Sequence, residues 1–519
     1  MRSLKKILFT FIVTCLSFVS YAQNKPNIIY ILADDMGIGD ISGLNPDSKI
    51  KTPNIDKLLD NGMNFTDAHT ASSVCTPTRY GIITGRYAWR TKLKKGVVDG
   101  YSKTILQDNI DTAPALLQRN GYNTAMIGKW HLGWNWVINN EDSIPRDAKL
   151  PEYKFTKEVE KHIDFTKPFS KGPINRGFDY FYGINASLDF PPYVFSENNK
   201  VTEIPLENFK RKGPDKSNPD WKKDFDKKQK MQRSGVISSN FDASETLLKL
   251  TEHSIDYILK QDNKKPYFLY VALTAPHTPV LPRNEFFGKS KAGAYGDFIQ
   301  ELDWSVGQII RALEKKGIEE NTIIIFTADN GASKISFPLE YEDKYAHKPS
   351  RELKGRKGSL YEGGHRVPFI IQWKKIIKPK TINNTSISLN DLYATCASIV
   401  GETQKKNQGV DSYSIWDLIT GGEGYGRKSS VYSDFGGRFA VRKGNFKLIL
   451  SPIYKKRKLY NLQDDISENN NLYGQSDYYK IEKDLLNEIT KTIKNGRSTN
   501  GEKLKNEGTE IWDALYWMK

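Results

Sequence analysis

The stretch Asn27-Ile28-Ile29-Tyr30-Ile31-Leu32 decides the fold, because it is a continuous apolar run of strand length that leads through Ala33 into Asp34-Asp35. The stretch Thr322-Ile323-Ile324-Ile325-Phe326 is of the same kind and leads into Asp329-Asn330-Gly331, and residues 267–272 form a third run. Apolar runs that do not alternate with polar residues are typical of strands buried on both faces of a largely parallel sheet. These runs predict such a sheet, with polar residues at the carboxyl ends of two strands.

Helical patterns lie between these runs, at residues 112–120 and 298–316, and a glycine follows each as a stop signal. Strands alternating with helices predict an α/β domain over residues 23–404. From residue 405 the pattern changes to short strands at 431–433, 439–442, 446–450 and 458–462, a hairpin turn at 443–445 and a helix at 481–493. We expect residues 405–519 to form a smaller α+β domain with an antiparallel sheet.

The first 22 residues have the pattern of a secretory signal peptide. Two lysines precede an apolar run at 7–19, and the segment closes on Ser20-Tyr21-Ala22. The alternative is a membrane anchor, but the run is shorter than the roughly 20 apolar residues that a spanning helix needs. We therefore expect an exported, soluble protein without a stable membrane span, located in the periplasm or else secreted or held at the cell surface.

The composition is that of a globular chain, with 38% hydrophobic and 27% charged residues in 519. A disordered, collagen-like or multi-span membrane chain is thereby excluded. The net charge of +16 suits a polyanionic partner without identifying it. Two basic stretches of weak periodicity, 137–172 and 205–236, are expected to be solvated surface insertions. Their alternative role is a basic, aromatic-bearing rim around a substrate site.

Asp34, Asp35, Asp329 and Asn330 follow two strands whose carboxyl ends could be adjacent. Ligands of open parallel sheets bind at such ends. Carboxylate and amide oxygens are the ligands that Ca²⁺ or Mg²⁺ prefers. Either pair alone could simply cap a helix or form a turn, but the two together favour a metal site.

The three cysteines, at 15, 75 and 396, make neither a disulfide framework nor a cysteine zinc cluster. Cys15 leaves with the signal peptide, and Cys396 is expected to be a buried thiol in a helix at 392–400. Cys75 begins Cys75-Thr76-Pro77-Thr78-Arg79, where it could be a buried thiol beside a turn or a nucleophile activated by Arg79.

Three further segments place cations or imidazoles in loops rich in glycine or proline. They are Gly128-Lys129-Trp130-His131-Leu132-Gly133, Thr274-Ala275-Pro276-His277-Thr278-Pro279 and Lys357-Gly358-Ser359-Leu360-Tyr361-Glu362-Gly363-Gly364. Each could be an ordinary turn or a solvated lysine, although histidines at strand ends are suggestive of acid–base chemistry. Lys354 competes with Lys357 for the role of the lysine in the third segment.

In this order along nearly the whole mature chain, the segments resemble the type I sulfatases, the formylglycine-dependent arylsulfatase family, and in particular a bacterial polysaccharide sulfatase. The C-x-P-x-R-x₅-T-G-R element starting at Cys75 matches the signature of that family. The resemblance implies an alkaline-phosphatase-like fold, with a large mixed sheet flanked by helices and a smaller C-terminal α+β domain.

The resemblance also implies a nucleophile and a metal. A maturation enzyme would oxidise Cys75 to formylglycine, whose hydrate carries two hydroxyls, and one hydroxyl would attack the sulfate sulfur. Ca²⁺, with Mg²⁺ less favoured, would be held by the modified Cys75 and by oxygens of Asp34, Asp35, Asp329 and Asn330.

The surrounding residues receive roles from the same resemblance. Arg79 would steady the hydrate and the metal cluster. Lys129, His277 and Lys357 would bind the sulfate and assist the leaving oxygen. His131 would take a proton from the second hydroxyl, so that the aldehyde re-forms and sulfate is expelled. Ser187 is a weaker match to a further sulfate-binding position.

The predicted function is hydrolysis of sulfate esters on a sulfated polysaccharide or its oligosaccharides, with an algal polymer such as ulvan preferred. Glycosaminoglycans and small aryl sulfates are alternative substrates. A phosphate or phosphonate ester hydrolase of the same fold is a second alternative, against which Cys75 argues. A non-catalytic glycan-binding protein is a third, but Cys75 and the metal carboxylates are all present. Nucleic acid is not an expected partner, since the chain is exported and has no helix-turn-helix or zinc-finger pattern.

Overall fold

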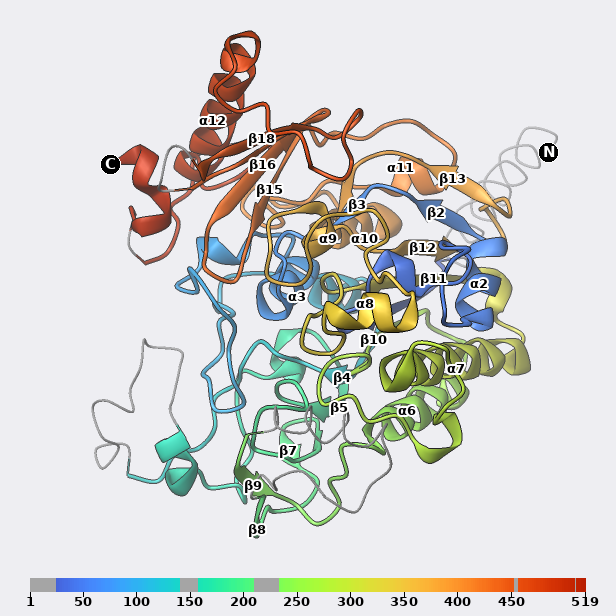
Figure 1. Cartoon of the computed structure of the whole chain (residues 1–519). Coiled ribbons are helices and arrows are strands. Elements are labelled where there is room, and N and C mark those ends of the chain that lie inside the picture. Colours follow the sequence, from blue (N-terminus) through green and yellow to red (C-terminus); the bar gives the residue numbers. More distant parts are fainter. Residues whose placement is uncertain (1–24, 141–156, 210–232, 452–455, 509) are drawn as a thin grey trace, which may run out of the picture.

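The computed structural model describes residues 25–140, 157–209, 233–451, 456–508 and 510–519 (Figure 1). The predicted signal peptide lies outside the described residues, as do the middle parts of both predicted insertions. None of the helices in these described ranges has the length and apolar character needed to cross a bilayer.

A large mixed sheet forms the centre of the molecule. Counting only described residues, its ten strands lie in the order β13 (Thr381–Asn383), β2 (Met63–Phe65), β12 (Phe369–Gln372), β11 (Thr322–Ala328), β1 (Asn27–Ala33), β10 (Tyr267–Ala272), β4 (Asn123–Lys129), β5 (Tyr180–Ile184), β6 (Ser196–Glu197) and β7 (Lys200–Val201). The five strands from β11 to β5 are mutually parallel, and β12 and β6 run antiparallel to their neighbours. The predicted fold class is confirmed.

Helices cover the sheet in two groups. One group contains α2 (Pro53–Asp60), α6 (Thr246–Lys260) and α7 (Gly293–Lys316), and the other contains α3 (Cys75–Thr84), α4 (Ala113–Arg119) and α10 (Leu392–Val400). Shorter helices follow in the connecting loops: α8 (Glu340–Tyr345), α9 (Glu362–His365) and α11 (Trp416–Ile419). The strand β10 is buried along its whole length, as the apolar run predicted, and α6 packs on it.

The ends of the helices follow from local sequence. The hydroxyl of Thr112 accepts a hydrogen bond from the amide of Ala115, which caps the start of α4. Gly317 ends α7 with φ of 69°, a conformation that glycine adopts without strain. The helix α7 begins five residues before the predicted position 298, because its first turn carries Gly293 and Gly296 and so lacks a clear apolar period.

The C-terminal region forms the four-stranded antiparallel sheet β15 (Ser429–Ser433), β16 (Phe439–Lys443), β17 (Phe446–Ile449) and β18 (Lys458–Asn461), with α12 (Tyr479–Lys494) packed on it (Figure 1). The predicted hairpin joins β16 to β17, where Lys443 pairs with Phe446. One apolar cluster contains Tyr87 and Trp89 of the first domain together with Val441 of this sheet. The two regions therefore share packed surface, and the domain boundary at residue 404 stays a prediction.

The expectation that 137–172 is a solvated insertion is wrong for its described part. Val159, Ile163 and Phe169 are buried, and the Phe169 ring stacks on Trp134 with the ring centroids 3.8 Å apart. These apolar residues follow neither a helical nor a strand period, so periodicity did not reveal them. In the second stretch, β8 (Glu207–Phe209) pairs with β9 (Gly235–Ile237).

Candidate active site

The polar residues at the ends of β1 and β11 meet as predicted. The two strands are parallel neighbours, and Ala33 lies opposite Ala328, so the residues that follow emerge side by side. The amide of Asp35 donates to Asp329 Oδ1 at 3.1 Å, and Asn330 Nδ2 donates to Asp35 Oδ1 at 2.7 Å. All four side chains, including that of Asp34, are fully buried. The strand register therefore gathers three carboxylates and one amide in a water-poor space.

Three cations from three different elements face these carboxylates. Lys129, at the end of β4, places Nζ 2.7 Å from Asp34 Oδ2. Arg79 of α3 donates from Nε to Asp329 Oδ2 at 2.9 Å. Lys357 Nζ donates to Asp35 Oδ1 and Oδ2 at 2.6 and 2.7 Å.

These contacts set the ionisation of the carboxyl groups. Burial alone would raise the pKa of Asp34, but Lys129, followed by His277 and Arg79, holds it below its usual range. Burial and the neighbouring Asp34 raise the pKa of Asp329, although Arg79 opposes the change. Burial would lower the pKa of the Lys357 ammonium, but Asp35 raises it well above the ordinary value. The lysine therefore stays charged at neutral pH.

Cys75 is the first residue of α3 and is buried beside this charged group. Burial raises the pKa of its thiol, although the positive charges of Lys129 and Lys357 oppose the change. An unmodified thiol here is therefore protonated at neutral pH, and a protonated thiol is a weak nucleophile. The other described cysteine, Cys396, lies buried in α10 as predicted.

His131 and His277 both reach the same space, as predicted. His131 Nε2 lies 2.9 Å from the carbonyl oxygen of Val98, while its Nδ1 is buried and has no hydrogen-bond partner among the described residues. Burial and the nearby Lys129 hold the pKa of His131 well below its usual value, so the ring is neutral. His277 Nδ1 lies 2.6 Å from the carbonyl oxygen of Thr278, and its Nε2 faces Asp35 Oδ2 at 3.7 Å.

The structure distinguishes the two competing lysines. Lys354 Nζ donates to the carbonyl oxygen of Glu468 at 2.9 Å, away from the carboxylates that bind Lys357. The backbone amide of Lys357 donates to the carbonyl oxygen of Ala332, and that of Gly358 to the carbonyl oxygen of Ser73, close before Cys75. Lys357 is therefore the lysine that points into the site.

Ser187 is buried, and its hydroxyl donates to Asp189 Oδ1 at 2.7 Å. Asp189 Oδ2 accepts from Arg233 Nη1 at 2.6 Å, and the Arg233 guanidinium lies over the ring of Phe190 at 3.9 Å. Sequence reasoning assigned no role to Asp189, Phe190 or Arg233. The predicted basic rim at 205–236 was the one signal that pointed towards Arg233.

The cluster at the strand ends fits a hard divalent cation. Within the described parts of the chain, Asp34 Oδ1 and Asn330 Oδ1 are buried and have no hydrogen-bond partner, although Arg79 Nη2 lies 3.5 Å from Asp34 Oδ1. Buried oxygens without a partner are costly unless a cation or water satisfies them. Ligand atoms of Asp34, Asp35 and His277 also lie within 4.8 Å of one another. The side-chain oxygens of Asp34, Asp35, Asp329 and Asn330 could hold Ca²⁺ or Mg²⁺.

A second group with metal-ligand spacing, His69, Glu362 and His365, already contains a cation from the protein. Lys447 Nζ of β17 lies 2.9 Å from Glu362 Oε1, 2.9 Å from Glu468 Oε1 and 3.0 Å from His365 Nε2. All of these side chains are buried. An ammonium therefore occupies the place that a metal ion would take, and this group is an ion-pair network between α9 and the C-terminal sheet.

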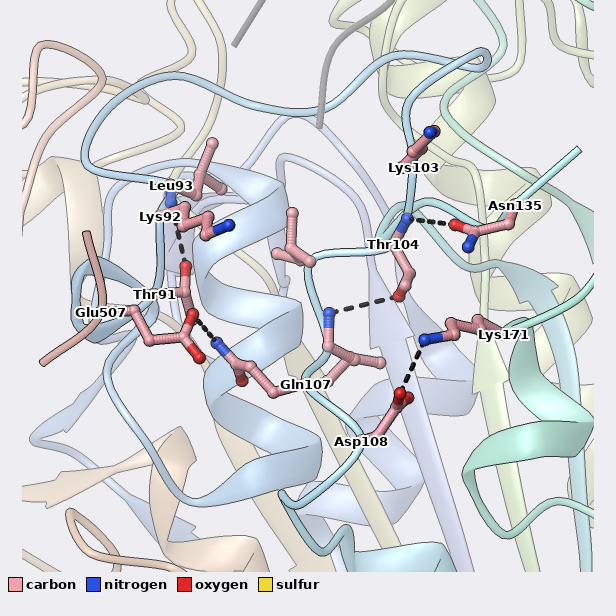
Figure 2. A pocket seen from close by; sticks show the side chains of 12 residues that line it. Thr91, Lys92, Leu93, Lys103, Thr104, Gln107, Asp108, Asn135, Lys171 and Glu507 are labelled. Atoms are coloured by element: carbon pink, nitrogen blue, oxygen red, sulfur yellow. Dashed lines mark hydrogen bonds and ion pairs between the residues drawn. The ribbon is translucent and has the colours of Figure 1, made fainter. Parts of the chain in front are cut away.

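A cavity of about 290 Å³ lies elsewhere on the surface and contains none of the predicted site residues (Figure 2). Its walls carry Lys171, which pairs with Asp108 at 2.7 Å, and Gln107, which donates to Glu507 at 2.7 Å. These polar side chains thus form ion pairs and hydrogen bonds with one another. The chemistry that the sequence predicts is therefore at the strand ends and not in this cavity.

Comparison with known proteins gives the family. A model described as sulfatase matches residues 26–402, which is well over half of the chain. The chain belongs to the sulfatase family. A second model, described as the C-terminal part of N-sulphoglucosamine sulphohydrolase, matches residues 356–495 of this sulfatase. The chain is accordingly a sulfuric ester hydrolase.

Relatives extend over most of this sulfatase. An N-acetylgalactosamine-6-O-sulfatase of Bacteroides thetaiotaomicron is 30% identical over 508 residues, covering 91% of this chain and 94% of the relative. Human steryl-sulfatase is 28% identical, covering 78% of this chain and 71% of its own. A solved structure from the metabolism of multiple glycosaminoglycans by Bacteroides thetaiotaomicron superposes with a TM-score of 0.76 at 28% identity, covering 90% of this chain and 99% of that one.

Proposed function

We propose that this sulfatase hydrolyses sulfate esters at the strand-end cluster, with Cys75, converted to formylglycine, as the nucleophile. The observation that carries the proposal is the position of Cys75. It begins α3 beside three carboxylates and three cations, within range of Lys129 and Lys357. As an unmodified thiol it would be protonated and weak, whereas one hydroxyl of an aldehyde hydrate could attack sulfur.

The charges of the cluster support a bound Ca²⁺. Asp34, Asp35 and Asp329 are balanced by Arg79, Lys129 and Lys357, so the side chains alone offer little net attraction to an anion. A divalent cation would be held by Asp34, Asp35, Asp329, Asn330 and the modified Cys75, and it would supply that positive charge and neutralise sulfate oxygens. Lys129, Lys357 and His277 then hold and orient the sulfate group, and Arg79 fixes Asp329.

His131 is suited to act as the base. Its Nε2 carries the proton, because that nitrogen lies at hydrogen-bond distance from the carbonyl oxygen of Val98. Its Nδ1 is therefore a free acceptor in a neutral ring, and in this proposal it takes a proton from the second hydroxyl of the hydrate. Loss of that proton re-forms the aldehyde and breaks its bond to the sulfate oxygen, which releases sulfate.

Ser187 takes an indirect place in this proposal. Its hydroxyl is bound to Asp189, so it supports the Asp189–Arg233 pair at the edge of the site and does not itself hold sulfate.

We further propose a sulfated polysaccharide or its oligosaccharides as substrate, with export through the predicted signal peptide to the periplasm. The relative that acts on N-acetylgalactosamine 6-sulfate supports an amino-sugar sulfate of a glycosaminoglycan. The basic stretches support an algal polymer such as ulvan equally well. The maturation enzyme that would oxidise Cys75 is the expected protein partner.

The test combines modification and turnover. Mass spectrometry of the peptide containing Cys75, after expression with a maturation enzyme, should show an aldehyde in place of the thiol. Cys75→Ala should abolish sulfate release and retain the fold. Retained release in that variant would disprove the assigned role. A panel of glycosaminoglycan, ulvan, carrageenan and aryl sulfates, with matched phosphate esters, identifies the substrate, and release from aryl sulfates alone would exclude the polysaccharide.

A further inference from the structure

The side chain of Arg233 lies at the rim of the active site and is 48% exposed. Its guanidinium covers Phe190 at 3.9 Å, and the Phe190 ring lies 6.0 Å from the ring of His131, measured between centroids. Asp189, which binds Arg233, is close enough to His277 for the two side chains to interact electrostatically. Arg233 and the proposed base His131 therefore both lie against the ring of Phe190, and Arg233 is partly exposed to solvent.

The orientation of Arg233 is fixed by three contacts with one residue. Its Nη1 donates to Asp189 Oδ2 at 2.6 Å and to the carbonyl oxygen of Asp189 at 3.0 Å, and its backbone amide donates to the same carbonyl oxygen at 3.2 Å. Ser187 fixes the other carboxylate oxygen of Asp189. The guanidinium is thus held over Phe190 before any ligand binds, which reduces the entropy lost on binding.

Donors on the guanidinium remain available. A guanidinium carries five N–H donors, and Nε and Nη2 of Arg233 donate to no acceptor in the part of the chain that the structure describes. Asp189 is buried and neutralises the charge of Arg233. A neutralised pair with directed donors suits uncharged oxygens better than a second anion, because the net electrostatic attraction to an anion is small.

We propose that Arg233 is a specificity-determining residue that donates hydrogen bonds to hydroxyl or ring oxygens of the sugar that carries the scissile sulfate. This inference rests on the proposed sulfatase activity of the strand-end cluster. Asp189 and Phe190 are positioning residues for Arg233, and Ser187 positions Asp189. An aryl sulfate has no oxygens at these places, so it gains nothing from Arg233.

The test compares kcat/KM for a sulfated monosaccharide and for 4-nitrophenyl sulfate in the full-length, matured enzyme. Charged hydrogen bonds of this kind change affinity about 10- to 100-fold. In Arg233→Met, the ratio of saccharide to aryl turnover should fall at least about tenfold, mainly through KM of the saccharide. The control is Arg119→Met. Arg119 is another partly exposed arginine and pairs with both Asp111 and Glu402. It lies at the end of α4, next to the start of β4, whereas Lys129 is at the other end of that strand.

Arg233→Lys keeps a cation beside Asp189 and so guards against misfolding of the methionine variant. A single ammonium cannot reproduce the fixed donor geometry, so the ratio should stay low in Arg233→Lys. An unchanged ratio in Arg233→Met, an equal fall for both substrates, or full recovery with lysine would overturn the assignment. If the wild type releases sulfate from no ester, the proposed function fails and the assignment of Arg233 fails with it. An active wild type with an unchanged ratio refutes Arg233 alone.

Discussion

Replacing Lys447 with methionine should destabilise this sulfatase strongly, although the residue is far along the chain from Cys75. Its ammonium lies 2.9 Å from a carboxylate oxygen of Glu362 and 2.9 Å from one of Glu468, and all three side chains have no solvent exposure. Methionine fills similar space but removes the ammonium from both buried carboxylates, and among the lysine and arginine ion pairs of the described residues Glu362 keeps only a longer contact with Arg366 Nη1 at 3.4 Å.

The distances give the size of the effect. At an effective dielectric constant of about 20, each contact at this distance is worth about 6 kcal/mol before desolvation is counted. Desolvation offsets much of this, and removing one partner of a buried pair typically costs about 3–5 kcal/mol. Because Glu362 begins α9 and its amide donates to Glu468 Oε2 at 2.7 Å, the loop that carries Lys357 should loosen too, and sulfate release should fall.

Urea denaturation followed by tryptophan fluorescence measures the loss. The matched control is Lys443→Met. Lys443 lies on the same β16–β17 hairpin as Lys447 and forms a surface pair with Asp484 of α12. Breaking that pair should cost at most about 1 kcal/mol. Adding Glu468→Gln to Lys447→Met should recover part of the stability, because one uncompensated carboxylate is removed. Equal denaturation midpoints for Lys447→Met and Lys443→Met would refute the reasoning.

Three further outcomes are expected. Burial raises the pKa of Asp303 to about 6, so the folded state holds its proton more tightly than the unfolded chain. The stability of the wild type relative to Asp303→Asn should therefore fall by up to about 3 kcal/mol between pH 4 and 6.5, and a flat difference in urea titrations would contradict this. Removing divalent cations with a chelator should lower both the melting temperature and sulfate release, and Ca²⁺ should restore both better than Mg²⁺. His131→Ala should lower kcat much more than it raises KM, and steady-state kinetics showing the reverse would remove it as the base.

The strand-end part of the site was predictable because it depends on local sequence. Continuous apolar runs identified β1, β10 and β11, and parallel neighbours necessarily bring Asp34 and Asp329 together. The Lys447 network was not predictable, because its members lie on elements whose packing no local pattern encodes. Arg233 was missed for a related reason, since its importance comes from lying on Phe190 and not from its neighbours in the sequence. The buried part of 157–172 was mistaken for surface because aromatic packing there has no period.

The burial of α3 limits the time at which another enzyme can modify Cys75. Every residue of this helix, from Cys75 to Thr84, is buried, and Arg79 binds Asp329, which lies 250 residues further along the sequence. A second enzyme that recognises the C-x-P-x-R segment could not bind it in the native state. The proposed oxidation of Cys75 would therefore have to be completed while the chain is still unfolded, before Arg79 pairs with Asp329. Oxidation of Cys75 and folding would then compete, and a chain that folds before it is oxidised would stay inactive.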